Sequence, residues 1–421
     1  MVSSDLLRAG CDLLRELSGG QSPLALSSLA PRLTDGIVIR IRERELPVQD
    51  RVSSYLESHG VDAAPRGARI ALVSEPGLPE ETSATFLEDL IAVLHRRGVD
   101  QAIQVRTRSV QELEAGLAAG GGRRGIGARC DVDAVWFVLR TKTVEPAPKM
   151  FELFRRLDAL RVPWRRAYAD DARDYSVGDQ AGSLIQAVGG VTHRIGLRGA
   201  RTLPWTLGID LSHHRDVEQS RVCVTLVGPA GRLTGAWCAL QARDETARPE
   251  SLRPLVRMAG ERLRESGGTD VVLVIRDGKH FKGDRPALYR EELETGAEVL
   301  ELAKNGNPPL FEEPADGCPI SPGTAVSGFH PESDWIFLLP GVTQETGGLG
   351  SVLKFRRLKG GDSSKFTDRD LAEALVALTY APVLGSRRSN FPAPIYWADG
   401  IAGASDVDLR FRGQADVFHL R

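Results

Sequence analysis

Three aspartates follow apolar runs in this chain, and their side chains are suited to binding metal ions. Asp210 lies in Leu207-Gly-Ile-Asp-Leu-Ser, Asp277 in Val274-Ile-Arg-Asp-Gly-Lys, and Asp399 in Pro394-Ile-Tyr-Trp-Ala-Asp-Gly. An ionised carboxylate at the end of an apolar strand is costly unless a positive group meets it. In a cleft that group is commonly Mg²⁺ or Mn²⁺, which prefer oxygen ligands. Several converging carboxylates are typical of two-metal cleavage of phosphodiesters.

Each aspartate also has an ordinary structural explanation. Asp210 could cap a turn, and the pair Asp277-Gly278 could form a tight turn. Asp399 could cap the start of a helix. The metal hypothesis therefore depends on all three side chains reaching one edge of the same sheet.

Composition indicates an ordinary globular protein. The chain has 421 residues, enough for two or three domains, and is 42% hydrophobic and 26% charged. Its net charge of -2 gives no overall signal for nucleic acid, although pairs of arginines could act locally. These pairs are Arg123-Arg124, Arg155-Arg156, Arg165-Arg166, Arg356-Arg357 and Arg387-Arg388. The five scattered cysteines predict no zinc site and no disulfide framework.

The sequence shows neither a membrane-spanning stretch nor the pattern of a signal peptide. No apolar run is long enough to cross a bilayer. The N-terminus, Met1-Val-Ser-Ser-Asp-Leu-Leu-Arg, lacks the charged and apolar regions of a signal peptide. We therefore expect a cytoplasmic protein that has no membrane partner.

Strands and helices alternate from about residue 66 to residue 200, which favours a parallel sheet wrapped by helices. The predicted strands are Ala68–Ser74, Val132–Arg140 and Val162–Tyr168, and the predicted helices are Thr82–Gly98, Lys149–Leu160 and a helix containing Ser183–Val188. Before this region we predict helices at Asp5–Leu17 and Val48–His59 and a strand at Ile37–Arg42.

A different order begins after about residue 200. Three strands, at Thr206–Leu211, Arg221–Val227 and Gly235–Gln241, precede a helix at Ser251–Glu265 and a fourth strand at Asp270–Ile275. Three antiparallel strands, a helix and a parallel strand are the order of an RNase H-like domain. Further predicted elements are a helix at Arg290–Leu302, strands at Trp335–Leu339 and Val352–Leu358, and a helix at Asp368–Tyr380.

The three aspartate segments, in this order and with these separations, resemble the PIWI domain of Argonaute proteins. Between the last two, Val342-Thr-Gln-Glu-Thr-Gly-Gly-Leu-Gly-Ser-Val-Leu-Lys resembles a further PIWI segment. The four segments together cover residues 203–400. The resemblance implies an α/β protein in which a Rossmann-like MID domain precedes an RNase H-like PIWI domain.

Active Argonautes complete their site with a glutamate between the first two aspartates. Glu245 lies in the corresponding stretch, with Asp244 and Glu250 as rivals. The resemblance thus implies a catalytic set of Asp210, Glu245, Asp277 and Asp399. Asp210 would bridge two Mg²⁺ or Mn²⁺ ions, Asp277 and Asp399 would each help to hold one, and Glu245 would fix the attacking water.

The region 66–200 resembles the MID domain, which holds the 5′ end of the guide strand. The segments that carry this resemblance are Leu160-Arg-Val-Pro-Trp-Arg-Arg-Ala-Tyr and Leu184-Ile-Gln-Ala-Val-Gly-Gly-Val. Ala187 stands where family members often have a lysine, a charge that Lys149, Arg155 and Arg165 could replace. The alternative is that these three residues belong to a solvated basic helix and strand end. Arg166 is a further candidate for contacts to nucleic acid.

No segment resembles a PAZ domain, so the chain looks like the short, MID–PIWI type of prokaryotic Argonaute. The implied domains are an N-terminal extension at 1–65, a MID-like domain at 66–200 and a PIWI-like domain at 201–421. Arg387, Arg388 and Asn390 precede the last aspartate and are candidates for phosphate contacts. His213 and His214 are interpreted as loop histidines near an anionic substrate, with a different metal site as the alternative.

The resemblance implies a guide-directed endonuclease in host defence against invading DNA, with a short guide DNA or RNA and a complementary target as partners. The alternative is a catalytically silent subunit that binds guide and target and activates a separate effector protein. Such an effector could supply the missing N-domain and PAZ-like functions. A third possibility is an unrelated RNase H-like nuclease, which would cut without a guide.

Overall fold

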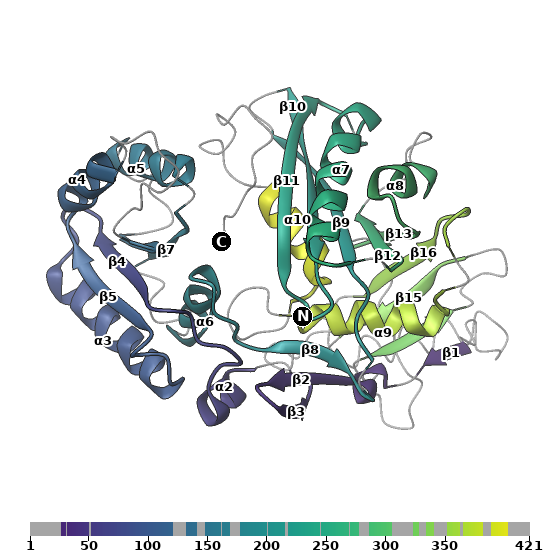
Figure 1. The fold of residues 1–421 in the computed structure, drawn as a ribbon, viewed down its shortest axis with the longest axis horizontal. Coiled ribbons are helices and arrows are strands. Elements are labelled where there is room, and N and C mark those ends of the chain that lie inside the picture. The colour runs from purple at the N-terminus through teal and green to yellow at the C-terminus, as the bar shows by residue number, and fades with distance from the viewer. Residues whose placement is uncertain are drawn as a thin grey trace, which may run out of the picture. The chain divides into compact units, whose positions relative to one another are not determined.

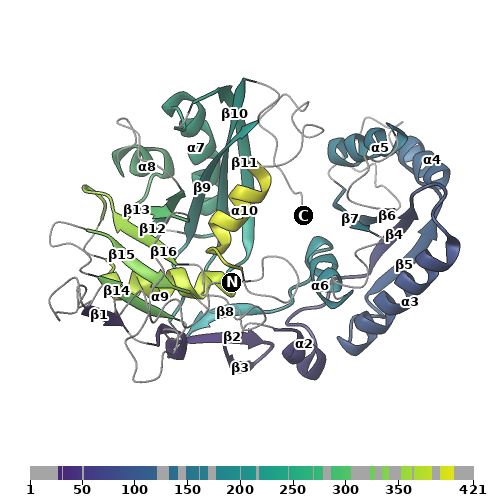
Figure 2. The ribbon, with the colours of Figure 1, turned by 180° about the vertical axis from the view of Figure 1, so that it is seen from behind.

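The computed structural model describes residues 27–402 apart from short internal segments. These segments are 31, 50–51, 121–131, 141–147, 161, 169–176, 200, 215–217, 245, 269, 278–285, 305–322, 328–333, 341–351, 363–364 and 382–388. The described residues divide into two compact units (Figures 1 and 2). One unit contains Ile39–Arg194, and the other contains residues 27–38, Ile195–Ala381 and residues 389–402. The predicted helix at Asp5–Leu17 lies outside the described residues.

The unit containing Ile39–Arg194 is built on a four-stranded parallel sheet, and we call it the four-strand unit. Its sheet strands are β4 (Ala68–Ser74), β5 (Ile103–Arg108), β6 (Ala134–Leu139) and β7 (Trp164–Tyr168), in the order β5-β4-β6-β7. Its helices are α2 (Ser53–His59), α3 (Glu80–Arg96), α4 (Val110–Gly120), α5 (Pro148–Ala159) and α6 (Val177–Ala187). The alternating, parallel arrangement predicted for this region is confirmed.

Helices cover both faces of this sheet because the side chains of β4 alternate between two cores. Ile70 and Leu72 pack with α3 and α6 on one face, whereas Ala71 and Val73 pack with α4 and α5 on the other. A parallel sheet that is buried on both faces reads as a continuous apolar run. The run Ala134–Leu139 is buried along its whole length for this reason.

The other unit contains a nine-stranded mixed sheet, and we call it the nine-strand unit. Its sheet strands are β1 (Ser27–Ala30), β9 (Thr206–His214), β10 (Gln219–Val227), β11 (Leu233–Ala242), β12 (Val272–Asp277), β13 (Ala297–Ala303), β14 (Thr324–Ser327), β15 (Ile336–Leu339) and β16 (Leu353–Arg357). Their order is β1-β14-β15-β16-β13-β12-β9-β10-β11. The helices are η1 (Leu33–Gly36), α7 (Pro249–Glu265), α8 (Pro286–Leu293), α9 (Asp368–Thr379) and α10 (Ala393–Ala402). Three further strands, β2 (Ile37–Ile41), β3 (Arg44–Pro47) and β8 (Arg194–Leu197), form a separate sheet in the order β3-β2-β8. In the sequence, the divisions between the two units fall within β2 and β8.

The nine-strand unit begins with the order predicted for an RNase H-like domain. β9, β10 and β11 pair antiparallel, and β12 then pairs parallel to β9. Helix α7 covers one face of these strands and α10 covers the opposite face (Figures 1 and 2). The predicted α/β fold class is thus confirmed. The domain boundaries at residues 65 and 200 stay predictions.

One predicted element in this unit is wrong. The segment Arg290–Leu302 does not form one helix, because α8 ends at Leu293 and β13 begins at Ala297. Glu294 takes a left-handed conformation with φ 57°, and Thr295-Gly296 follows it before the strand. This turn separates two apolar stretches that can be read as a single helical pattern.

No helix in the described part of the chain is long and apolar enough to cross a membrane.

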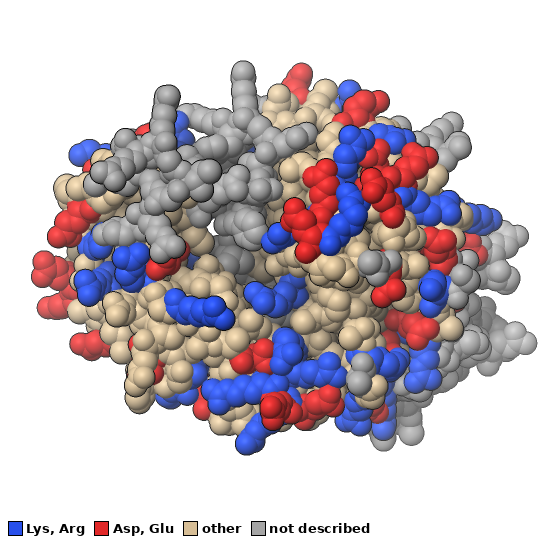
Figure 3. All heavy atoms as spheres, in the orientation of Figure 1, with Lys and Arg blue, Asp and Glu red and all other residues tan. Residues whose placement is uncertain are grey.

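The packing of α8 against α7 includes a buried carboxylate. Glu292 is 6% exposed and accepts hydrogen bonds from Arg253 Nη1 at 2.8 Å and Arg257 Nε at 2.9 Å. Burial raises the pKa of Glu292, but the two arginines outweigh it and hold the pKa below its usual value. Figure 3 shows basic and acidic side chains mixed over the region where Figure 1 places α7 and α8.

We expect Glu292→Gln to destabilise the protein by roughly 1.5–3 kcal/mol, the usual worth of hydrogen bonds to a charged group. Because the folded-state pKa is depressed, this stabilisation is present above the unfolded pKa of about 4.3 and is lost as the pH falls through the folded value. Urea unfolding at several pH values measures the difference. Glu291→Gln is the control, because Glu291 is 61% exposed and makes only a 3.2 Å ion pair with Arg253. Equal effects of the two substitutions at neutral pH would contradict this account.

Candidate active site

Asp210 lies in the middle of β9, on the sheet face that α10 covers. Its neighbours Ile209 and Leu211 point to the opposite face, where they pack with α7. Asp210 is 6% exposed, and its Oδ1 accepts a hydrogen bond from Leu211 N at 2.7 Å. The strand continues to His214, so Asp210 neither ends the strand nor caps a turn.

Asp277 is the last residue of β12 and lies beside Asp210. The parallel pairing of Arg276 with Ile209 places Asp277 level with Asp210 on the adjacent strand. Val272 and Val274 point toward α7, so by alternation Asp277 points to the same face as Asp210. Two carboxylates from distant parts of the sequence thus meet on one face of the sheet.

Asp399 comes from α10, which crosses this face. Helix α10 lies close to β9 because Gly208 has no side chain: a Cβ there would lie 2.4 Å from the carbonyl carbon and oxygen of Pro394. Thr225 Oγ1 donates to Pro394 O at 2.8 Å, and Arg221 Nη1 donates to Ile401 O at 3.1 Å. These contacts hold both ends of the helix on the sheet, and they place Asp399 over the sheet. Asp399 lies well inside α10, so it does not cap the start of the helix.

The three carboxylates converge on one ammonium group, that of Lys304. Its Nζ lies 3.0 Å from Asp210 Oδ2, 2.7 Å from Asp277 Oδ2 and 2.8 Å from Asp399 Oδ1. Lys304 directly follows β13, which pairs parallel to β12. We refer to Asp210, Asp277 and Asp399 as the aspartate cluster. Lys304 was not predicted from the sequence, and its only signal is its place directly after an apolar strand next to β12.

Burial and mutual repulsion shape the charges in the cluster. Burial raises the pKa of Asp210 to about 7; Lys304 opposes this shift, and the charges of Asp277 and Asp399 add to it. Burial also raises the pKa of Asp277. Burial lowers the pKa of Lys304, but Asp210 and Asp277 outweigh it and hold that pKa above its usual value. With a pKa of about 7, Asp210 is partly protonated at neutral pH, so the three carboxyl groups and the ammonium together carry a net charge between −1 and −2, and the cluster still attracts cations.

Structure comparisons find the same fold in known proteins. The chain matches the crystal structure of A. aeolicus Argonaute with a TM-score of 0.64 and 16% identity, over 100% of this chain and 61% of that chain. It matches Drosophila Piwi with a TM-score of 0.67 and 14% identity, over 94% and 61% of the two chains. Kluyveromyces polysporus Argonaute with a guide RNA gives a TM-score of 0.63 and 13% identity, over 90% and 52%.

This chain has an Argonaute-type fold. The resemblance inferred from the aspartate segments is therefore confirmed at the level of the fold, whereas the short MID–PIWI type stays a prediction. The chain spans between 52% and 61% of the length of these three structures. No protein-family profile matches the sequence, and no curated protein matches it.

Three residues predicted for the site, Glu245, Arg387 and Arg388, fall outside the described part of the chain. The two rivals of Glu245 are described: Asp244 accepts a hydrogen bond from Arg248 Nε at 3.2 Å, and Glu250 lies in the first turn of α7. The roles predicted for these residues stay predictions.

Two predicted polar residues near the cluster are exposed. The ring of His213 is hydrogen-bonded to Ser220, with 2.8 Å between Nδ1 and Oγ. Asn390 lies three residues before the start of α10, the helix that carries Asp399, and its side chain is exposed to solvent. The side chain is therefore accessible to a phosphate, and the phosphate contact itself stays a prediction.

The four basic residues predicted for the guide 5′ end do not share one face of the four-strand unit. Arg166 stacks over the rings of Phe154 and Trp164, 5.8 and 5.5 Å from their centroids, on the α5 face of the sheet. Arg165 is the neighbouring residue on β7 and points to the opposite face. Lys149 is exposed on α5, and Arg155 on the same helix forms an ion pair with Glu152.

The donor types in the aspartate cluster fit a divalent metal. Mg²⁺ and Mn²⁺ prefer hard oxygen ligands, and three converging carboxylates supply these. Within the part of the chain that the structure describes, no group of three or more His, Cys, Asp or Glu side chains surrounds a shared metal position. The carboxylates surround the Lys304 ammonium instead. A metal ion at the cluster would therefore compete with the Lys304 ammonium for the carboxylate oxygens.

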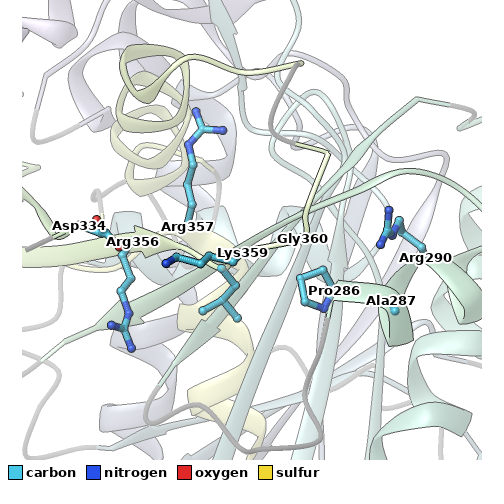
Figure 4. A pocket seen from close by; sticks show the side chains of 9 residues that line it. Pro286, Ala287, Arg290, Asp334, Arg356, Arg357, Lys359 and Gly360 are labelled. Atoms are coloured by element: carbon cyan, nitrogen blue, oxygen red, sulfur yellow. The ribbon is translucent and has the colours of Figure 1, made fainter.

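A separate cavity of about 510 Å³ lies between α8 and the end of β16 (Figure 4). Its lining residues are Pro286, Ala287, Arg290, Asp334, Arg356, Arg357, Leu358, Lys359 and Gly360. Arg356 and Arg357 point away from each other from β16, and each forms ion pairs with carboxylates. Neither Lys304 nor the aspartate cluster lines this cavity, so it is not part of the candidate active site.

Proposed function

We propose that this chain is a nucleic-acid-guided endonuclease that cuts a target strand paired to a short guide DNA or RNA. The observation that carries the proposal is the convergence of Asp210, Asp277 and Asp399 on one cation within an Argonaute-type fold. A structure of Kluyveromyces polysporus Argonaute holds a guide RNA, which supports a guide strand as the partner. Mg²⁺ or Mn²⁺ would be the cofactor.

Each carboxylate has a role that its position supports. Asp210 lies between strands β12 and β10 and would bridge two metal ions, and Asp277 and Asp399 would each help to hold one. Metal ions bound there would supply an activated water and charge stabilisation at the leaving oxygen. Glu245 would orient that water. The rigid strands β9 and β12 and the anchored helix α10 hold the aspartates in place before a target strand arrives.

Nucleic-acid binding would be shared between the two units. We propose that residues 201–421, which supply most of the nine-strand unit, are the PIWI-like part, that residues 66–200, which supply most of the four-strand unit, are the MID-like part, and that residues 1–65 are an N-terminal extension. Lys149, Arg155, Arg165 and Arg166 are proposed contacts to phosphates near the guide 5′ end, and Arg387, Arg388 and Asn390 are proposed contacts near the cluster. Such contacts set the register of the strand, whereas base pairing with the guide would read the sequence. We also propose that the protein acts in the cytoplasm, in host defence against invading DNA.

The second candidate is a catalytically silent subunit that binds guide and target and activates a separate effector protein. The position of Lys304 favours it, because the ammonium contacts a carboxylate oxygen of every member of the aspartate cluster. In that case the three aspartates would serve to hold Lys304 and the helix α10 in place. The two candidates share guide binding and differ in whether the target is cut.

A cleavage assay separates these candidates. The protein is loaded with a 5′-phosphorylated guide DNA or RNA and mixed with matched and mismatched labelled targets in Mn²⁺ or Mg²⁺. We expect a single cut in the matched target, which chelation of the metal abolishes. Tight guide-dependent target binding without a cut would support the silent subunit. Cutting that needs no guide would contradict both candidates and indicate an unrelated RNase H-like nuclease.

A further inference from the structure

Lys304 occupies the point at which the aspartate cluster converges. Its side chain is 8% exposed, and its Nζ contacts one oxygen of each aspartate at 2.7–3.0 Å. Three hydrogen bonds from one ammonium use all of its donors. This lysine therefore neutralises part of the charge of the cluster and ties β9, β12 and α10 together.

A divalent metal at the same point would need the oxygens that Lys304 contacts. Mg²⁺ binds oxygen at about 2.0–2.1 Å and demands a near-octahedral arrangement. An ammonium that lies 2.7–3.0 Å from the same three oxygens fills that space, and it carries a charge of the same sign as the metal. The metal and the ammonium cannot occupy the centre of the cluster together.

We propose that Lys304 is a built-in competitor of the catalytic metal, which keeps the aspartate cluster assembled and is displaced when the metal binds. This inference rests on the metal-dependent function proposed above. A lysine has a flexible four-carbon stem, so its ammonium can move without a change in the backbone. In the metal-free state the carboxylates are thus held in place, and their mutual repulsion is reduced.

The ring of Phe391 is a partner that the ammonium already contacts and could keep once it is displaced. Phe391 precedes α10, and the centroid of its ring lies 5.4 Å from Lys304 Nζ, within the range of a cation–π contact. A phosphate of a nucleic-acid strand at the cluster would be a stronger partner for the ammonium, because both groups are charged. A bound strand should therefore draw Lys304 away from the aspartates and tighten metal binding. By thermodynamic linkage the metal should tighten strand binding by the same factor.

Direct measurement of Mn²⁺ binding tests the competition without reference to cleavage. Full-length wild type, Lys304→Met and Lys354→Met are titrated with Mn²⁺ by calorimetry or electron paramagnetic resonance. Lys354→Met is the matched control, because Lys354 also contacts an aromatic ring, that of Trp335 at 4.9 Å, and contacts no member of the cluster. We expect Lys304→Met to bind Mn²⁺ about tenfold or more tightly than wild type, and Lys354→Met to match wild type. Equal affinities in all three proteins would overturn the inference.

The coupling to nucleic acid gives a second prediction from the same titrations. A short single-stranded oligonucleotide should tighten Mn²⁺ binding by wild type and by Lys354→Met. In Lys304→Met this gain should be smaller, because no ammonium remains to be displaced. An equal gain in all three proteins would contradict the proposed role of the strand phosphate.

Amine labelling of the wild-type protein keeps the inference testable if Lys304→Met fails to fold. An amine-reactive reagent and mass spectrometry report the labelling rate of each lysine with and without Mn²⁺. We expect slow labelling of Lys304 in the metal-free protein, an increase of several-fold on addition of Mn²⁺, and no change at Lys354. An unchanged rate at Lys304 under conditions in which Mn²⁺ binds would overturn the inference.

The outcomes separate this inference from the function on which it rests. If wild type and Lys304→Met bind Mn²⁺ with the same affinity and wild type cuts its target, only the role of Lys304 is wrong. If neither protein binds Mn²⁺, the metal-dependent function is wrong and the inference falls with it.

Discussion

Asp277→Asn is expected to abolish guide-directed cleavage while leaving guide binding intact. Asparagine keeps the shape of the side chain at the end of β12 but removes the negative charge that would hold a metal ion. Metal ions supply several kcal/mol of charge stabilisation in such sites, and a loss of about 4 kcal/mol corresponds to roughly a thousandfold lower rate. Single-turnover cleavage of a matched target by guide-loaded protein measures the effect.

Asp270→Asn provides a matched control for this substitution. Asp270 is exposed and lies two residues before the first residue of β12, whereas Asp277 is the last residue of that strand. Guide binding by both variants should equal that of wild type, and only Asp277→Asn should lose cleavage. Cleavage by Asp277→Asn at a rate within a few-fold of wild type would contradict the proposed role of the aspartate cluster.

Gly208→Ala is expected to destabilise the nine-strand unit and to displace Asp399. The added Cβ would lie 2.4 Å from the carbonyl carbon and oxygen of Pro394 and 2.6 Å from its Cβ. These are mostly backbone atoms of α10, so the conflict cannot be relieved by rotating a side chain. Overpacking of this kind costs about 1–3 kcal/mol and occasionally more. Urea unfolding should show this loss, and the cleavage rate should fall because α10 carries Asp399.

Gly400→Ala is the control for the effect of adding a methyl group at a glycine near the cluster. Gly400 lies on α10, and a Cβ there would meet no atom within 4 Å. Alanine is favoured over glycine within a helix by up to about 1 kcal/mol, so this variant should be as stable as wild type or more stable. Equal stability of Gly208→Ala and Gly400→Ala would contradict the close packing of α10 on β9.

The alternation of apolar runs and amphipathic segments predicted much of the fold. β4 and β6 are largely buried, and β7 pairs parallel to β6; the apolar runs of β4 and β6 were recognisable because helices cover both faces of the sheet. β5 and α4 were missed. Four of the six side chains of β5 are at least partly exposed polar or charged residues, so that strand lacks the apolar run of its neighbours.

The candidate site could be predicted from the sequence only in part. The convergence of Asp210 and Asp277 follows from the pairing of β9 with β12: the two strands start level with each other, so the last residue of β12 lies beside Asp210 in the middle of β9. Lys304 was missed for a physical reason: the segment Arg290–Leu302 was read as one helix, which hid β13 and its place beside β12. A lysine that follows a helix has no reason to lie beside the aspartates, whereas one that follows β13 does.

The measurement that tests guide-directed cleavage most directly is the position of the cut as the guide is moved along the target. Guides of one length are shifted by single nucleotides along the same labelled target, and the cut is mapped in Mn²⁺. We predict that the cut moves by one nucleotide for each nucleotide of shift, and that Asp277→Asn leaves the target intact for every guide. A cut that stays at one target position whatever the guide, or no cut while guide and target are bound, would contradict this prediction.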